Sequence, residues 1–153
     1  MHNHLIKIII VLFITSFPCN LSQSIENVNS PSNMGSLLVK IIGFESNKGE
    51  CWFALDSSET IYESENLVFI GKVLPIINKE ILVRIDSLNY GIYAIRVFHD
   101  ENSNGKLDSN ILGIPTEDYG YSNNASSWFG PPSWEKAKFI FNIEELTIEI
   151  SVE

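Results

Sequence analysis

The chain has few of the residues that build disulfide frameworks or multi-histidine metal sites. Among its 153 residues there are two cysteines and three histidines. His2, His4 and Cys19 fall in an N-terminal segment that we expect to be removed, so one residue of each type remains. A disulfide within the mature chain and a multi-histidine zinc site are thereby excluded. Cys51 lies in an apolar strand pattern, and we expect it to be a small buried side chain rather than a nucleophile.

Basic residues are also scarce. Ten Lys and Arg stand against 19 Asp and Glu, which gives a net charge of −9. Removing residues 1–24 takes away Lys7 and no acidic residue, so the charge becomes −9 − 1 = −10. Because binding to nucleic acid through phosphates needs clustered Lys and Arg, this acidity excludes a nucleic-acid partner. It suits solubility and cation binding.

Long apolar runs are missing except near the N-terminus. The run at 8–17 is too short to span a bilayer, which needs roughly 20 apolar residues, but it has the length of a signal-peptide core. Small residues at Ser22 and Ser24 predict cleavage after Ser24, and hence a secreted or periplasmic protein without a transmembrane span. Cys19 leaves lipid anchoring as the alternative, although the large residues just before it fit a lipoprotein signal poorly.

Helical periodicity is missing as well, since no pattern beyond the signal exceeds two turns. After a flexible lead-in at 25–36, we expect one domain at 37–153 built of strands with alternating apolar residues. The expected strands are 37–44, 50–55, 67–77, 79–85, 92–98, 138–143 and 146–152.

These strands predict an all-β fold, an antiparallel two-sheet β-sandwich of about seven strands of immunoglobulin or transthyretin type. A small barrel is the alternative. The first two strands and the last two are each expected to form a hairpin, and residues 56–66 to hold a short helical turn or a loop. Residues 99–137 show no sustained periodicity of apolar residues. We therefore predict one long ordered loop there, and such a loop in a compact domain is usually functional.

The start of this loop has the spacing of a calcium site. Its oxygen-bearing residues occupy positions one, three, five and nine of an EF-hand-type loop, with a glycine at six. Ile111 stands where a glutamate would close the shell, so missing ligands would come from Glu101, Glu117 or Asp118. We predict either a weak calcium site, with a dissociation constant on the order of 10⁻⁴ to 10⁻³ M, or a metal-free Asx turn. The candidate ligands are Asp100, Asn102, Asn104, Asp108 and the backbone carbonyl of Lys106.

A hydrolase is the least supported function. The chain has no Gly-x-Ser-x-Gly motif, and its only candidate base is His99, with Asp100 or Asp118 as the partner. The adjacent carboxylates of Glu117 and Asp118 would point opposite ways in extended backbone, so they do not make a hydrolytic pair. We therefore expect no enzyme.

The second half of the loop is rich in aromatic residues, with five between 119 and 134. On a rigid sandwich such a segment is suited to bind carbohydrate or a cell-envelope polymer. The alternative is that the rings cover an open end of the core, with Pro131 and Pro132 fixing the path of the chain. The candidate binding residues are Tyr119, Tyr121, Trp128 and Trp134.

The stretches VFHDENSNGKLDSNILGIPTEDYGYSNNA, at 97–125, and FGPPSWEKAKF, at 129–139, resemble the signature of a bacterial secreted family, domain-of-unknown-function family 2141. With the Gly-x-Tyr-Ala strand at 91–94, the resemblance covers residues 37–152. It implies a secreted all-β domain with no established biochemical activity. Ser-Ser-Trp at 126–128 departs from the pattern, so the resemblance implies no role for Trp128. The leading hypothesis is a non-enzymatic, secreted or periplasmic β-sandwich whose 100–108 loop is held by its polar residues, either around calcium or as a metal-free turn.

Overall fold

The computed structural model describes residues 33–64 and 66–153. The predicted signal peptide, Cys19 and most of the predicted lead-in lie outside the described residues. The first strand begins at Met34 rather than at Leu37. No helix in the described part of the chain is long and apolar enough to cross a membrane.

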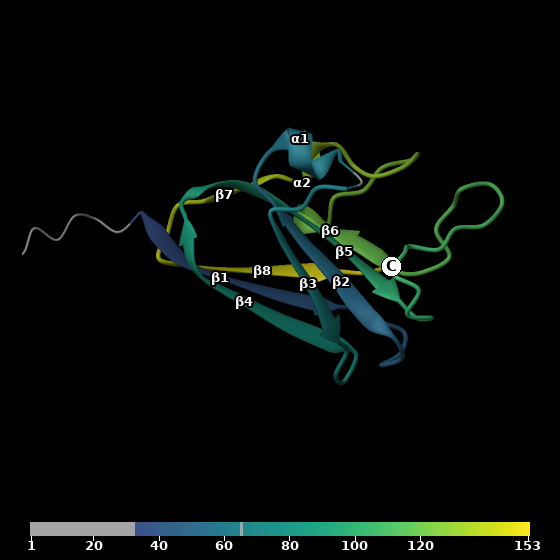
Figure 1. Ribbon diagram of the computed structural model, residues 1–153. Helices are drawn as coiled ribbons and strands as arrows, with labels where there is room; N and C mark the ends of the chain where they lie inside the picture. Colours follow the sequence, from purple (N-terminus) through teal and green to yellow (C-terminus); the bar gives the residue numbers. More distant parts are fainter. Residues whose placement is uncertain (1–32, 65) are drawn as a thin grey trace, which may run out of the picture. The chain divides into compact units, whose positions relative to one another are not determined.

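Two β-sheets face each other across one core (Figure 1). The three-stranded sheet has the order β4 (Glu80–Asn89), β1 (Met34–Ile42), β8 (Glu145–Ser151). The larger sheet has the order β3 (Ile70–Pro75), β2 (Glu50–Asp56), β5 (Gly91–Asp100), β6 (Tyr119–Tyr121), and β7 (Phe139–Phe141) also pairs with β5. The predicted all-β sandwich is confirmed, and the two open sheets do not close into a barrel.

Three short helical segments lie between the strands: α1 (Glu59–Tyr62), the 3₁₀ turn η1 (Ser122–Asn124) and α2 (Trp134–Ala137). The Ser58 side chain caps α1 by accepting the Ile61 N–H, because the first N–H groups of a helix have no partner within it. This is the helical turn expected between residues 56 and 66. The other two segments and β6 lie inside the predicted long loop, so part of that loop is regular structure.

The core follows from the alternation of side chains along each strand, since successive residues of a strand point to opposite faces. Cys51, Phe53 and Leu55 of β2 are buried as expected, and burial raises the pKa of the Cys51 thiol to about 12. The thiol therefore stays protonated and unreactive near neutral pH. The other inward residues are Leu37, Val39, Ile41, Ile81, Val83, Ile85, Tyr93, Ile95, Val97, Phe141 and Ile150.

The two predicted hairpins are wrong, and so is the purely antiparallel pairing. β1 and β2 lie in different sheets, as do β7 and β8. The turn after β1 is a corner between the sheets, where Gly43 and Gly49 adopt φ of 99° and 71°. β8 returns to pair with β1 in parallel, from Ser36 opposite Glu145 to Ile42 opposite Ser151. Alternation reports which face of a strand is buried, and it contains no information about the neighbouring strand.

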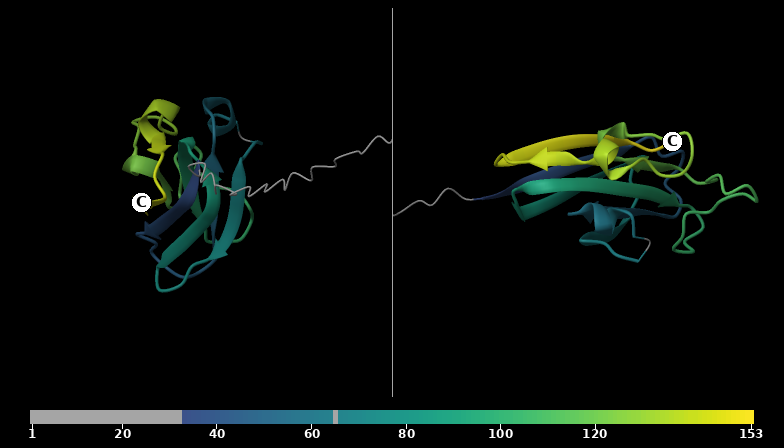
Figure 2. Two further views of the ribbon diagram at one scale, coloured as in Figure 1. Left: turned by 90° about the vertical axis from the view of Figure 1, so that its left-hand side faces the viewer. Right: turned by 90° about the horizontal axis from the view of Figure 1, so that it is seen from above.

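A buried serine ties the irregular segments to the larger sheet. The Ser122 hydroxyl accepts the Ile95 N–H at 2.8 Å and donates to the Ala137 carbonyl at 2.6 Å. The Asn123 side-chain amide donates to the carbonyls of three consecutive residues, 136 to 138. These contacts join η1 to α2, while residues 101–118 project beyond the ends of the strands (Figure 2).

Candidate functional site

The outer face of the larger sheet, which points away from the core, carries a row of large side chains. Val73, Trp52, Phe98 and Tyr119 stand directly opposite one another on β3, β2, β5 and β6. The Trp52 and Phe98 rings are stacked, with centroids 5.8 Å apart and planes 10° apart. The row remains half exposed because none of the described elements covers this part of the sheet.

The next row of outward-facing residues along the same strands has small side chains at one end, and these leave a hollow in the surface. Gly71 and Ala54 lie opposite each other on β3 and β2, followed by Arg96 and Tyr121 on β5 and β6. The resulting groove, which we call the outer groove, encloses about 450 Å³. That volume lies within the range of small-molecule sites, roughly 300 to 1,000 Å³. Its rim is formed by Asn66, Leu67, Val68, Lys72 and Leu107.

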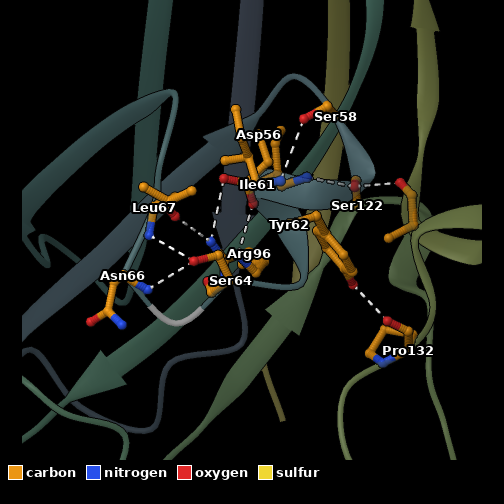
Figure 3. Close-up of polar contacts among 12 residues, drawn as sticks. Asp56, Ser58, Ile61, Tyr62, Ser64, Asn66, Leu67, Arg96, Ser122 and Pro132 are labelled. Atoms are coloured by element: carbon orange, nitrogen blue, oxygen red, sulfur yellow. Dashed lines mark hydrogen bonds and ion pairs between the residues drawn. The ribbon is translucent and has the colours of Figure 1, made fainter.

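Arg96 holds one wall of the outer groove in place (Figure 3). Its Nε donates to Asp56 Oδ2 at 2.7 Å, and its Nη2 donates to Oδ1 at 3.3 Å. The guanidinium also donates to the carbonyls of Ser64 and Leu67, both at 3.2 Å, and lies over the Tyr62 ring. Because it engages β2, α1 and the segment after α1 at once, Arg96 fixes the wall instead of standing free for a ligand.

Asp56, the partner of Arg96, is fully buried. Burial raises the pKa of the Asp56 carboxyl above its usual value, although the hydrogen bond and the charge of Arg96 act in the opposite direction. A buried carboxylate of this kind depends on its partner, since an unpaired charge away from water is strongly unfavourable.

Asp100 connects the predicted calcium loop to the floor of the outer groove. Its Oδ1 accepts the Asn104 N–H at 3.0 Å, and its Oδ2 accepts the Gly105 N–H at 2.7 Å and the indole N–H of Trp52 at 3.1 Å. Burial opposes the charge of Asp100, but these donors outweigh it and hold the pKa of the carboxyl below its usual range. Gly105, at φ 78°, lies directly against the Trp52 ring.

The other predicted calcium ligands lie close to one another. The side-chain amides of Asn102 and Asn104 both donate to the Asp108 carboxylate, and the Lys106 N–H donates to Asn104 Oδ1 at 2.9 Å. Glu117 closes the loop from its far end, where its carboxylate accepts the N–H groups of Glu101 and Asp108 at 3.0 and 2.9 Å. The spacing thus produces a loop held by its own Asx-type hydrogen bonds.

No three His, Cys, Asp or Glu side chains within residues 33–64 and 66–153 are already close enough together to hold a metal ion. Calcium binding by the loop remains a prediction, because its amide and carbonyl oxygens are a separate kind of ligand.

The four aromatic residues predicted to bind a ligand are divided between different environments. Tyr119 and Tyr121 line the outer groove, with rings 5.9 Å apart and 72° from parallel. Trp128 is 97% exposed on a loop, whereas Trp134 is 7% exposed and packs against Tyr62. Trp134 thereby covers part of the sheet, as in the alternative interpretation of the aromatic segment.

Sequence reasoning missed Trp52 and Phe98 as groove residues. Both occupy the strand face opposite the core residues, and a large aromatic side chain on that face was the available signal. Their adjacency was not visible, since β2 and β5 are separated in the chain by two other strands. His99, the candidate base, is fully buried and lines neither the outer groove nor the smaller hollow beside Tyr119.

Fold and groove together define a β-sandwich domain with an aromatic, largely apolar groove on one outer face. The chain belongs to the family described as an uncharacterized protein conserved in bacteria (DUF2141), which matches residues 39–149. The resemblance noted in the sequence is thereby confirmed. Comparison with curated proteins found no match, and comparison with solved structures found none either.

Proposed function

We propose that this protein is an exported, non-enzymatic binding domain that takes a carbohydrate of the cell envelope in the outer groove. The observation that carries the proposal is the row of Val73, Trp52, Phe98 and Tyr119 beside a hollow of about 450 Å³. Such a groove combines apolar walls with a few polar groups, as ligand sites generally do.

Carbohydrate suits the chemistry of this surface. A pyranose ring presents C–H groups on its faces and hydroxyls around its edge, so it needs apolar contacts and hydrogen-bonding groups side by side. The aromatic row supplies the first. Asn66, Lys72 and the tyrosine hydroxyls of Tyr119 and Tyr121 lie around the groove to supply the second.

The binding proposal is tested with soluble fragments of cell-wall polysaccharide in isothermal titration calorimetry. Tyr119→Ala removes one ring from the groove, and we expect it to weaken binding about tenfold, since an aromatic contact contributes on the order of 1 kcal/mol. Trp128→Ala is the matched control, because this ring is exposed but does not line the groove. Binding that is lost with Trp128→Ala and kept with Tyr119→Ala would contradict the proposal, as would no binding at all.

The proposal of export rests on the N-terminal sequence, with its apolar run at 8–17 and its small residues Ser22 and Ser24. Intact mass spectrometry of the protein recovered outside the cytoplasm tests it. The expected mature chain begins at Ile25, so retention of residues 1–24 would contradict cleavage. A chain that begins at a lipid-modified Cys19 would show a lipid-anchored protein instead.

Calcium binding by residues 100–108 is a second, narrower proposal. It is supported by the convergence of Asn102, Asn104 and Asp108, which lie within hydrogen-bond distance of one another. Thermal unfolding in calcium and in chelator tests it. Calcium at 100 times its dissociation constant adds about 2.7 kcal/mol to the free energy of unfolding. No shift at about 100 mM calcium, which is 100 times the weakest predicted dissociation constant, would contradict calcium binding and leave a metal-free turn.

A further inference from the structure

Two loops carry the most exposed large apolar side chains in the described part of the chain. Ile111 is fully exposed, and Trp128 and Phe129 are 97% and 92% exposed. Ile111 lies in residues 109–116, which we call the first tip, and the two aromatic residues lie in residues 125–133, the second tip. The green and yellow-green segments that contain these tips project from the same end of the sandwich (Figure 1, Figure 2). Apolar side chains gathered in this way mark a surface that meets another molecule or a membrane.

Neither tip carries a charge, although the chain is strongly acidic. Charged residues make up 19% of the sequence, and the net charge is −9. Residues 109–116 contain no charged residue, and residues 119–134 contain none either, although at the average frequency this second stretch would have about three. An uncharged segment can leave water without the large desolvation cost of an ion.

The backbone of the first tip is closed by Asn110. The side-chain carbonyl of Asn110 accepts the N–H groups of Leu112 and Ile114 at 2.9 and 3.1 Å. Its backbone N–H donates to the Ile114 carbonyl, and its backbone carbonyl accepts the Gly113 N–H, both at 2.9 Å. Because an unpaired N–H group is costly away from water, a tip that satisfies these donors itself is suited to insertion among lipid headgroups.

The second tip is held at both of its ends. Near its start, the Lys136 ammonium donates to the Ser126 carbonyl at 3.2 Å, and near its end the Tyr62 hydroxyl donates to the Pro132 carbonyl at 2.8 Å. Trp128 lies between these two anchors with its ring exposed. Tryptophan is enriched at the boundary between lipid headgroups and acyl chains, where its ring is accommodated better than in water.

We propose that the two tips dock this protein on a lipid bilayer, with Ile111, Trp128 and Phe129 inserted at the level of the headgroups. A fluid bilayer adapts to two separate loops, whereas a protein partner needs a matched, closely packed surface. The tips also lack the charged groups that fix the register of a protein partner. Because the rest of the chain is acidic and would be repelled by anionic lipid, the docking surface is an electrically neutral, zwitterionic bilayer.

The test measures the tryptophan fluorescence of the full chain with phosphatidylcholine vesicles whose acyl chains are brominated, because bromine quenches a tryptophan that it contacts. We expect quenching that is insensitive to salt and is lost in Trp128→Ala. The other two tryptophans, Trp52 and Trp134, lie in the outer groove and in a buried cluster, so they should remain unquenched. The apolar run at 8–17 contains no tryptophan, so it does not contribute to this signal.

Ile111→Asp combined with Phe129→Asp should abolish the quenching, because it places two charges where the bilayer excludes them. Ile140→Asp is the matched control, since it makes the same kind of change at a 66% exposed side chain. Ile140 pairs with Ile92 near the start of β5, whereas the first tip follows the end of that strand, so this control should be quenched like the wild type. Carbohydrate binding by the outer groove should be unchanged in the double variant, because neither tip residue lines the groove.

Three results would overturn the proposal. The first is a wild-type chain that is not quenched at any vesicle concentration. The second is quenching that persists in the double variant, or that needs anionic lipid and disappears with added salt, since either would place the contact elsewhere on the chain. The third is self-association of the wild type without quenching by lipid that is lost in the double variant, which would show that the tips are covered by a second copy of this chain.

Discussion

The outer faces of the two sheets differ in kind. On the three-stranded sheet, Lys40 pairs with Glu149 at 3.1 Å, and Arg84 pairs with Asp86 at 2.7 Å and with Glu145 at 3.4 Å. All of these groups are largely exposed. On the larger sheet, Arg96 pairs with the fully buried Asp56, and its guanidinium lies over the Tyr62 ring.

The difference shows that one strand pattern supports two kinds of outer surface. Exposed ion pairs gain little, because water and salt screen them, so we expect the first face to tolerate substitution. A buried pair depends on both partners and constrains its surroundings. At the outer groove, Arg96 and Asp56 hold one wall in a defined position, as a preorganised binding site requires.

The largest difference between the faces should appear when one large side chain is removed from each. Trp134→Ala empties the cluster that Trp134 forms with Tyr62, Ala94 and Ala137 on the larger sheet. We expect it to lower the free energy of unfolding by about 4 kcal/mol, as truncation of buried aromatic residues does. Leu82→Ala on the other sheet, where the side chain is 66% exposed, should change it by less than about 0.5 kcal/mol. Urea denaturation measures both, and equal losses would show that the cluster is not a second core.

A smaller effect is expected from breaking one ion pair on each face. Arg96→Ala leaves Asp56 buried without its cation, and should cost about 3 kcal/mol of stability. Lys40→Ala breaks the exposed pair with Glu149 and should change stability by less than about 0.5 kcal/mol. The same denaturation experiment compares them.

A double variant separates charge from packing at Arg96. Asp56→Asn removes the buried charge, so Arg96→Ala combined with Asp56→Asn should be more stable than Arg96→Ala alone. A double variant that is no more stable would mean that the loss comes from the contacts of Arg96 with Ser64, Leu67 and Tyr62 instead.

The smallest effect concerns the titration of the two paired aspartates. Burial raises the pKa of Asp56, whereas the hydrogen bond from Ser36 and the pairing with Arg84 lower the pKa of Asp86. ¹³C NMR of the carboxyl groups should therefore give midpoints on opposite sides of 3.8, the ordinary value. By linkage, Asp86 stabilises the fold above pH 3.8 and loses this effect on acidification; Asp56 stabilises it below pH 3.8 and loses this effect as pH rises. Coincident midpoints would mean that the two faces do not differ in burial.

Several features could be predicted from single strands and short motifs. The inward residues of β2, β4 and β5 follow from alternation alone, and the turn-rich 100–108 stretch follows from its Asn, Asp and Gly spacing. Glu117 was expected near that loop as a metal ligand, and it does lie there, but it accepts two backbone N–H groups. Its place near the loop could be predicted from the sequence. Its role as a hydrogen-bond acceptor could not, because that role depends on the path of the chain between residue 108 and Glu117.

Trp128 and Trp134 illustrate what could not be predicted. Both lie in the same aromatic segment with similar neighbours, yet one is exposed and the other is buried. Trp134 is buried because Ala94 leaves room on β5 and Tyr62 arrives from α1, both distant in the chain. No spacing rule within the segment contains that information.

By itself, the sequence determined the all-β class, the buried face of most strands, the family and the polar loop after β5. These depend on neighbours one to nine residues apart, where side-chain period and turn chemistry act directly. Only the tertiary structure decided that β1 pairs in parallel with β8, that Trp52 meets Phe98, and that His99 faces Glu101 and Asp118. Those contacts join segments whose proximity is set by how two sheets bury a common core, a property of the whole chain.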